Sequence, residues 1–457
     1  MRRGGNRAAL AAALGCAAWM HAPAARANGR YPLANQLVVD PKDPLHMVAR
    51  TTFGNLDTTD RGAAWGWVCE NAIGDFGQED PPIAVTASGN LLVASSAGLS
   101  TSPDHGCTFT RATGAIGDRS GVDVTVDPVN SHAALALESK FVNGQYTVYL
   151  VRTDDDGATW TDVGQLPAGV LAETLEVAPS NPDRVYVSAR QDTTAQPSVL
   201  LRSDDGGQTW TQSTIDLPNG AGVFIGAVDP KNADVVYVRA KVPANSIGRV
   251  LMTADAGATW KQIWKGQGDV AGFALSADGT NLAVGGPESG INVAGTSDLL
   301  FSTTNPLGPS CLTWVAGKLV ACAKEAVDDF SIGISYDKGL SFTPLLHFPD
   351  LTPRPCGANT SAGVCVDYWS SVASTIGIDA GSGDDAGAEA GSEVPREPDA
   401  TGKIDAQGGW SCALDPNARR SSARDDRTSA RFAGAWLIAV GIAVASRARR
   451  GTRPHRR

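Results

Sequence analysis

The sequence predicts an all-β protein, a β-propeller built from about seven four-stranded sheets, or blades, arranged in a ring. Three observations lead to this prediction. The 457 residues include 51 Gly, 26 Pro and 11 Trp, a composition that favours strands and tight turns over helices. An eight-residue pattern recurs about every fifty residues, and a strand–turn–strand pattern lies about half a repeat before each copy.

The eight-residue pattern has Ser or Thr first, Asp third, Gly fifth and an aromatic residue eighth, and it is the Asp-box. Its Asp, Gly and aromatic positions are Asp60, Gly62 and Trp65; Asp104, Gly106 and Phe109; Asp155, Gly157 and Trp160; Asp205, Gly207 and Trp210; Asp255, Gly257 and Trp260; and Asp337, Gly339 and Phe342. The carboxylate can accept backbone N–H groups of its own turn, the Gly can adopt a positive φ, and the ring can be buried between sheets. We therefore interpret the boxes as structural. The run Asp154–Asp156 is interpreted as one structural Asp with two solvated neighbours, not as a metal site.

The spacing of the boxes predicts the number of blades. Their Asp residues are 44, 51, 50, 50 and 82 residues apart, and the last interval fits two repeats. We assign a decayed copy to Ser302–Asn305, followed after an insertion by Leu312–Trp314. With a first hairpin such as Leu37–Pro41 and Met47–Ala49, each unit holds four strands, which matches one propeller blade. Residues 28–376 then form seven blades, with six and eight as alternatives.

The first 27 residues are predicted to be a signal peptide. Three arginines precede an apolar run, and Ala25-Arg26-Ala27 is a cleavage site, so the mature chain would begin near Asn28. The alternative is lipidation at Cys16, for which the preceding residues are a poor match.

Six cysteines between the signal peptide and the tail suggest up to three disulfides in an exported chain: Cys69, Cys107, Cys311, Cys322, Cys356 and Cys365. Proximity in sequence favours Cys311–Cys322 and Cys356–Cys365 and leaves Cys69–Cys107, but the sequence alone does not fix this pairing. The chain has no C-x-x-C pair and its six histidines are scattered, so we expect no zinc site and no cofactor.

Composition and motifs also restrict the function. The formal net charge is -10 and no basic stripe stands out in the middle of the chain, which argues against a nucleic-acid partner. The sequence contains no Gly-x-Ser-x-Gly, no phosphate-binding loop and no His-Glu-x-x-His.

The boxes and their period resemble those of sortilin-type and sialidase-type propellers, of xyloglucan-cleaving glycosidases and of photosystem II assembly factors. The resemblance covers about residues 28–350 and implies the fold, but not an activity. A sialidase would have an arginine triad whose first Arg lies in an Arg-Ile-Pro context, and neither Arg30 nor Arg50 fits; a Tyr nucleophile with a Glu partner is not assignable. The cysteine-rich module that follows a sortilin propeller has no counterpart, since only Cys356 and Cys365 follow the last box.

The C-terminal part changes in composition. Residues 377–407 form an acidic Gly/Ala/Asp-rich linker, which we expect to be a flexible tether. The segment 408–457 contains Cys412, an apolar helix at 432–446 and terminal arginines. It resembles the C-terminal sorting tails of myxobacterial surface proteins, which implies processing at Cys412, although the spacer to the helix is long. The alternative is a plain anchor with a basic cytoplasmic end, although 15 apolar residues are short for a bilayer span.

The sequence therefore predicts an exported cell-surface propeller that binds an extracellular protein or glycan ligand without catalysis. Loops on one face of the ring would form the binding surface, and the C-terminal segment would meet the membrane and the export and sorting machinery. The alternative is an extracellular glycoside hydrolase, xyloglucanase- or sialidase-like, which would need two carboxylates about 6.5–9.5 Å apart if it inverts. Nothing in the sequence singles out such a pair. Exposed aromatic residues beside two acids on one face would favour the hydrolase, and a flat mixed face would favour binding.

Overall fold

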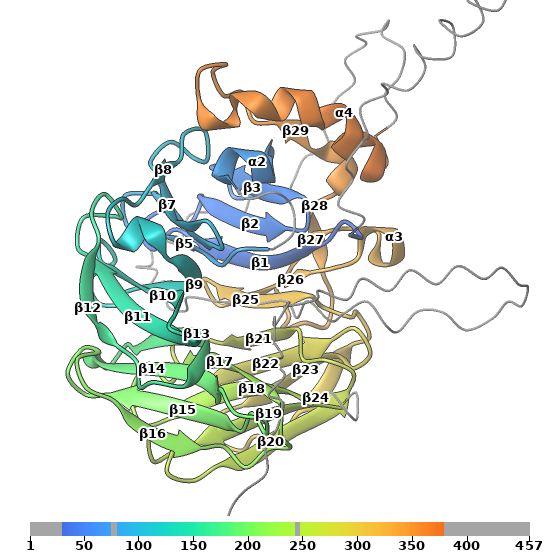
Figure 1. Cartoon of the computed structure of the whole chain (residues 1–457). Helices are drawn as coiled ribbons and strands as arrows, with labels where there is room; N and C mark the ends of the chain where they lie inside the picture. Colours follow the sequence, from blue (N-terminus) through green and yellow to red (C-terminus); the bar gives the residue numbers. More distant parts are fainter. Residues whose placement is uncertain (1–29, 75–79, 243–246, 379–457) are drawn as a thin grey trace, which may run out of the picture. The chain divides into compact units, whose positions relative to one another are not determined.

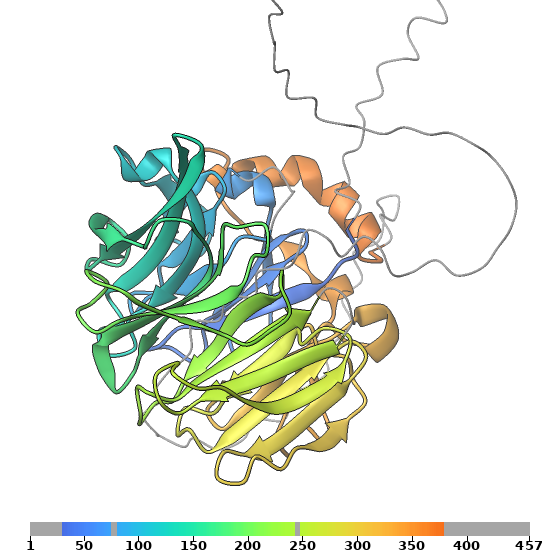
Figure 2. The same cartoon turned by 60° about the horizontal axis from the view of Figure 1, so that its bottom comes forward.

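The computed structural model describes residues 30–74, 80–242 and 247–378. These residues form seven four-stranded antiparallel blades, one of which has a fifth strand added at its outer edge. The blades follow one another around the ring in chain order (Figures 1 and 2). The predicted fold class and blade number are thus confirmed. The signal peptide, the linker apart from its first two residues, and the tail with Cys412 and the apolar run 432–446 lie outside the described residues.

The bounds of the strands are given blade by blade, from the innermost strand to the outermost. Blade 1 has β1 (Ala34–Val39), β2 (Met47–Thr51), β3 (Gly54–Thr58) and β4 (Gly66–Val68); blade 2 has β5 (Ile83–Val85), β6 (Leu91–Ser95), β7 (Gly98–Ser102) and β8 (Thr110–Arg111); blade 3 has β9 (Ser120–Val126), β10 (Ala134–Val142), β11 (Gln145–Thr153) and β12 (Thr161–Gln165). Blade 4 has β13 (Val170–Ala178), β14 (Asn181–Gln191), β15 (Ser198–Ser203) and β16 (Thr211–Thr214); blade 5 has β17 (Gly222–Val228), β18 (Val236–Val242), β19 (Ile247–Thr253) and β20 (Lys261–Gln267). Blade 6 has β21 (Gly272–Leu275), β22 (Asn281–Gly286), β23 (Gly290–Gly295) and β24 (Ser302–Asn305); blade 7 has β25 (Cys311–Val315), β26 (Lys318–Cys322), β27 (Ile332–Ser335) and β28 (Thr343–Leu346).

The hydrophobic core is divided among the seams between neighbouring blades. Seven clusters of buried apolar residues each lie between two consecutive blades, including one between blade 7 and blade 1. At the seam between blades 3 and 4, for example, Leu137 and Leu150 pack against Val187. Because both faces of the blades are covered in this way, second strands such as β6 and β22 are apolar on both sides rather than alternating. Each seam buries aliphatic surface that no single blade could bury alone.

The Asp-boxes form the turns between the third and fourth strands of blades 1 to 5 and of blade 7. The fourth and fifth box positions have positive φ, as at Asp156 (57°) and Gly157 (82°). Only glycine fits at the position of Gly157, since an added Cβ would lie 2.4 Å from Leu92 Cδ2 of the preceding blade. The box therefore fixes both the turn and the distance between blades.

The assignment of the decayed box to Ser302–Asn305 and Leu312–Trp314 is wrong. In the structure Ser302–Asn305 is β24, and Leu312–Trp314 lies in β25 of the next blade. The equivalent turn of blade 6 spans 296–301, with Leu299 at a φ of 55° where the complete boxes have their own positive-φ residue. This turn has Leu300 in place of the fifth-position Gly, and Trp314, which resembles the aromatic residue of a box, belongs to the next blade.

A closing segment, residues 347–378, completes the ring after blade 7. It contains η2 (Phe348–Asp350), then β29 (Thr352–Pro353), which pairs in parallel with β4, and then η3 (Ser361–Cys365) and α4 (Val366–Thr375). In Figure 1 this orange segment lies beside α2 (Glu70–Ile73) at the outer edge of blade 1. The described residues also include η1 (Ile116–Asp118) and α3 (Glu325–Asp328).

All six cysteines between the signal peptide and the tail form disulfides, but the pair Cys356–Cys365 favoured by proximity and the pair Cys69–Cys107 left by elimination are both wrong. Cys69 is bonded to Cys365 and Cys107 to Cys356, whereas Cys311–Cys322 joins β25 to β26 as expected. The physical reason is ring closure, which brings the closing segment against blades 1 and 2 across more than 200 residues of sequence. Three disulfides indicate that the protein resides in an oxidising environment.

Candidate functional site

The antiparallel blades divide the ring into two faces. The turns between strands one and two, and the Asp-boxes between strands three and four, share one side, which we call the box face. The turns between strands two and three, together with the connections between blades, share the opposite side, which we call the loop face. Functional side chains can be assigned to one face or the other from their position along a strand.

The Asp-box carboxylates are occupied by their own turns. In the third box, Asp155 Oδ1 accepts the Thr159 N–H at 2.8 Å and the Thr153 hydroxyl at 2.8 Å, and Thr153 Oγ1 in turn accepts the Gly157 N–H at 2.9 Å. Hydrogen bonds of this kind from Thr209, above all from its hydroxyl, lower the pKa of Asp205 to about 2. These acids are held ionised by local donors, so their geometry is that of turn formation.

Each box also reaches back to the preceding blade. The Trp65 indole of blade 1 donates to the Leu345 carbonyl of blade 7 at 3.2 Å. Trp160, Trp210 and Trp260 pack against the clusters at the seams between blades 2 and 3, 3 and 4, and 4 and 5. The aromatic positions of the boxes thus hold neighbouring blades together.

On the loop face, the hairpin of β10 and β11 carries an exposed aromatic pair. Phe141 and Tyr146 are directly paired across the strands, 61% and 46% exposed, with ring centroids 5.0 Å apart. The tip between them is Asn143-Gly144, both at positive φ, as in a two-residue type I′ turn. Each strand of this hairpin has nine residues. A regular hairpin therefore presents two aromatic rings to solvent in a fixed arrangement.

Below this hairpin, Arg119 binds two acids of blade 3. Its guanidinium contacts Glu138 Oε2 at 3.4 Å and Asp162, and lies 3.7 Å from the centroid of the Tyr149 ring. Glu138 is completely buried, whereas Asp162 is 50% exposed. Burial raises the pKa of Glu138 to about 7, although the charge of Arg119 opposes this shift. A completely buried acid and a half-exposed acid thus share one arginine.

The two arginines considered for a sialidase triad are engaged with protein groups. Arg50 is buried and donates to Asn35 Oδ1 at 2.7 Å and to the Asp80 carbonyl at 2.9 Å. Arg30 contacts Asp80 and is 2.6 Å from Glu70. Both guanidinium groups are therefore engaged with groups of blade 1 and of its connection to blade 2.

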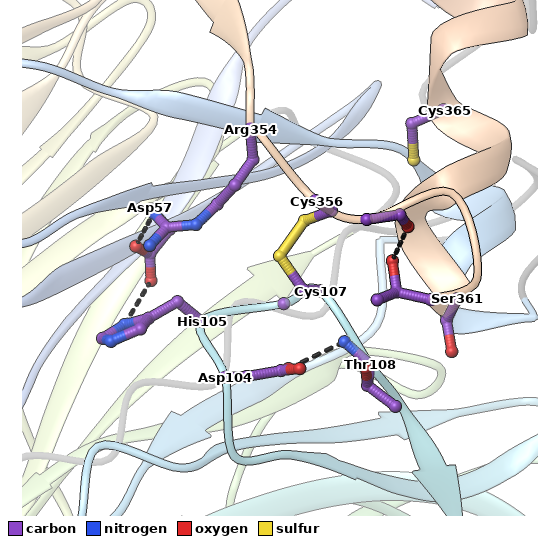
Figure 3. Close-up of a disulfide and its surroundings, with 12 residues drawn as sticks. Asp57, Asp104, His105, Cys107, Thr108, Arg354, Cys356, Ser361 and Cys365 are labelled. Carbon is purple, nitrogen blue, oxygen red and sulfur yellow. Dashed lines mark hydrogen bonds and ion pairs between the residues drawn. A yellow bond between two sulfur atoms is a disulfide. The ribbon is translucent and has the colours of Figure 1, made fainter.

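On the box face, histidines of blades 1 and 2 meet. His46 Nε2 lies 2.9 Å from Asp57 Oδ2 and 3.3 Å from His105 Nδ1, and His46 Nδ1 lies 3.3 Å from Asp40 Oδ2. Burial alone would lower the pKa of His46, but its hydrogen bonds to Asp40 and Asp57 raise it to about 9. Figure 3 shows His105 and Arg354 on either side of Asp57, beside the Cys107–Cys356 disulfide.

Sequence reasoning missed both the aromatic hairpin and this histidine cluster. The histidines seemed scattered because His46 and His105 are 59 residues apart in sequence. The repeat pattern could have indicated this cluster. His105 is the fourth residue of the second box, and the fourth residue of a box points toward the preceding blade. The aromatic pair could have been found from Asn143-Gly144, which is a strong hairpin sequence.

The hollow between the outer parts of blades 6 and 7 is a further candidate site. It has a volume of about 390 Å³ and is lined by Asn305, Pro306, Leu307, Asp328, Phe330 and Phe342. Its lining includes a single acid, so it does not supply the paired carboxylates that glycoside hydrolysis requires.

Comparison with known proteins supports the fold. No family model matches the chain. The oligoxyloglucan-reducing end-specific xyloglucanase of Emericella nidulans is 28% identical over 152 residues, which make up 31% of this chain and 17% of the fungal protein. The protein named probable oligoxyloglucan-reducing end-specific xyloglucanase of Neosartorya fischeri is 26% identical over 151 residues, with the same shares. The match thus spans less than a fifth of these curated relatives.

Two solved structures illustrate the likeness of the fold. Hydrazine synthase of Kuenenia stuttgartiensis has a TM-score of 0.50 at 11% identity, over 67% of this chain and 97% of that chain. An ancestral GH74 enzyme has a TM-score of 0.44 at 13% identity, over 70% of this chain and 55% of that chain. At 11% identity the likeness to hydrazine synthase concerns the propeller architecture alone.

Proposed function

We propose that this protein is an exported propeller that binds a polysaccharide on its loop face. The observation that carries the proposal is the exposed pair of Phe141 and Tyr146 on the β10–β11 hairpin. Sugar rings have apolar C–H faces that pack on aromatic rings, and Tyr adds a hydroxyl that can bond to a sugar hydroxyl. The partial sequence similarity to two xyloglucanases supports xyloglucan as the first substance to test.

The geometry favours binding over hydrolysis. Glu138 would have the raised pKa that a general acid needs, but its side chain is completely buried and covered by Arg119. A substrate oxygen could not reach it without displacement of the arginine. The sequence similarity to xyloglucanases nevertheless favours hydrolysis as the second candidate function, with Glu138 and Asp162 as the acids to test.

The location that we propose is the cell envelope or outer surface. The three disulfides support an oxidising compartment, and the sequence pattern of residues 1–27 supports export. Anchoring or processing of the tail at Cys412 remains a prediction. Among the described residues no helix is long and apolar enough to cross a membrane.

Binding and sugar release can be measured together on the secreted protein. Xyloglucan and a panel of other polysaccharides and sialosides are presented in affinity electrophoresis, and new reducing ends and released sugars are quantified. We expect retardation by at least one polysaccharide and no sugar release. The double variant Phe141→Ala/Tyr146→Ala should lose the retardation, with its free energy of unfolding changed by no more than about 0.5 kcal/mol, because exposed sites contribute little to stability.

Tyr336→Ala is the matched control, since Tyr336 is also exposed but lies in the last box on the opposite face. Equal loss in both variants, or no retardation by any polysaccharide, would contradict the proposal and direct the search to a protein ligand. Sugar release that disappears in Glu138→Gln and Asp162→Asn would establish the second candidate function instead.

A further inference from the structure

Three side chains on the box face converge on one point between blades 1 and 2. The atoms His46 Nε2, Asp57 Oδ2 and His105 Nδ1 lie 2.9, 3.3 and 3.6 Å from one another. Each can supply one ligand atom to a cation, and all three lie within 4.8 Å of one another. Two imidazoles and one carboxylate form a common ligand set for zinc and its neighbours among the transition metals.

The spacing of these atoms fits tetrahedral coordination. Zinc lies about 2.0–2.1 Å from His nitrogen and Asp oxygen, so two ligands of one tetrahedral ion are roughly 3.3–3.4 Å apart. The three observed separations surround this value. Because neither backbone nor side chains need a large movement, a cation could enter with a fourth position open to solvent. His105 provides the access, since its side chain is 40% exposed while His46 and Asp57 are buried.

The partners behind the three ligands orient them as in known metal sites. Asp40 Oδ2 faces His46 Nδ1, so His46 would keep its proton on Nδ1. The second proton, on Nε2, would be released to solvent when the cation takes the Nε2 lone pair. Asp40 is itself held by the backbone N–H groups of Lys42 and Asp43, at 2.7 and 3.1 Å. Arg354 of the closing segment binds Asp57 Oδ1 and leaves Oδ2 toward the histidines.

The other seams show what is particular to this one. The fourth residue of a box reaches the first-hairpin turn of the preceding blade at several seams: Asp156 of blade 3 bonds to Ser88 of blade 2, and Lys338 of blade 7 to Asn281 of blade 6. Both of these contacts are hydrogen bonds between side chains at the protein surface. At the seam between blades 1 and 2 the same geometry instead brings together two imidazoles and a buried carboxylate.

We propose that His46, Asp57 and His105 form a binding site for a divalent transition-metal ion of the zinc class, which clamps blade 2 to blade 1. The site lies on the face opposite the proposed polysaccharide-binding hairpin, so it is independent of that function. His105 is two residues from Cys107 and Asp57 binds Arg354, so the ion would join both blades to the closing segment. We therefore expect the metal to stabilise the region where the chain closes its ring.

The test uses the full secreted chain, freed of metal with a chelator and titrated with Co²⁺ alone and then with Zn²⁺. We expect the visible ligand-field absorption of four-coordinate Co²⁺, saturation at one equivalent, and displacement by Zn²⁺. His105→Ala should weaken Co²⁺ binding by more than about 100-fold, because even loss of an outer partner costs about 10–100-fold in metal affinity. Asp40→Asn, which alters such an outer partner, should weaken it by about 10–100-fold.

His132→Ala is the control, because His132 is an exposed histidine that contacts Asp156 at the next seam. It should bind Co²⁺ with unchanged affinity and spectrum. Folding of each variant is checked by thermal unfolding in the presence of chelator. Absence of a four-coordinate Co²⁺ spectrum in the unaltered protein, or an unchanged spectrum and affinity in folded His105→Ala, would overturn the proposal.

Discussion

The ring contains two kinds of seam, and they are stabilised differently. The seams between blades 2 and 3, 3 and 4, and 4 and 5 combine aliphatic clusters and box tryptophans with polar contacts such as Arg184–Asp234, and the described residues place no disulfide across them. The region where the ring closes, around blades 7, 1 and 2, adds a fifth strand, two disulfides and a cluster of buried charges. The same repeat unit thus contacts its neighbour in two ways. At most seams it does so without covalent links, and at ring closure it does so with disulfides and an added strand.

The difference follows from chain connectivity. Consecutive blades are joined by short connections, so a seam between them closes a small loop, whereas the seam between blades 7 and 1 brings together residues almost 300 positions apart. The entropy of closing so long a loop must be offset by local contacts. Each blade uses four consecutive strands, so within the described residues closure involves no exchange of strands within a four-stranded blade. The closing segment provides the additional linkage instead.

The largest expected effect comes from the disulfide that spans the ring. Cys69 and Cys365 are 296 residues apart in sequence, but the Cys107–Cys356 disulfide lies within this interval. With that inner bond intact, changing Cys69 and Cys365 to Ser opens an effective loop of only about 48 residues. The same change at Cys311 and Cys322 opens a loop of 11 residues. Loop entropy predicts losses of unfolding free energy of about 4 and about 3 kcal/mol, respectively. Urea unfolding of the two double variants measures the difference. Equal losses would show that β29 and the packing at the seam, not the covalent bond, dominate closure.

A second prediction tests whether the plainer region also stores buried charge. The pKa of Glu138 at the seam between blades 2 and 3 is raised to about 7 from an ordinary value of 4.5. The folded state therefore holds a proton that the unfolded state releases, and this stabilisation is complete below about pH 4.5 and lost as the pH rises through about 7. The loss amounts to about 3 kcal/mol, since each pKa unit corresponds to about 1.4 kcal/mol.

Glu138→Gln isolates this contribution, because all other groups titrate in both proteins. Unfolding free energies measured from pH 4 to pH 8 should fall more steeply for the unaltered protein than for Glu138→Gln. Asp154→Asn, which changes an exposed acid of the third box, should keep the original profile. Parallel profiles for the unaltered protein and Glu138→Gln would mean that Arg119 fully compensates the buried carboxylate.

The two kinds of seam also differ in how far the sequence predicts them. The boxes could be predicted because Asp155, Gly157 and Trp160 act within one turn, and the same local physics recurs in each copy. The histidine cluster and the pairing of Cys69 with Cys365 could not, because they depend on where closure brings distant residues. The turn of blade 6 could not be located from the sequence for a related reason. Because it lacks the Gly of the motif, only its position in the folded ring shows that it is equivalent to an Asp-box. The aromatic hairpin is an intermediate case. Its turn could be predicted from two adjacent residues, but the solvent exposure of its aromatic rings depends on the packing of the whole ring.

The smallest expected effect concerns the indole nitrogen Nε1 of a box tryptophan, compared between the two kinds of seam. Trp65 Nε1 donates to the Leu345 carbonyl across the closing seam, whereas the buried Nε1 of Trp160 has no hydrogen-bond partner among the described residues. Replacing either Trp by Phe removes similar apolar surface. Trp65→Phe also loses a hydrogen bond and leaves a carbonyl without its donor, while Trp160→Phe removes an unsatisfied donor. We therefore expect Trp65→Phe to be less stable than Trp160→Phe by about 1–2 kcal/mol in urea unfolding. The opposite order would mean that the closing seam relaxes around Phe, and that its reinforcement lies in the closing segment rather than in the box.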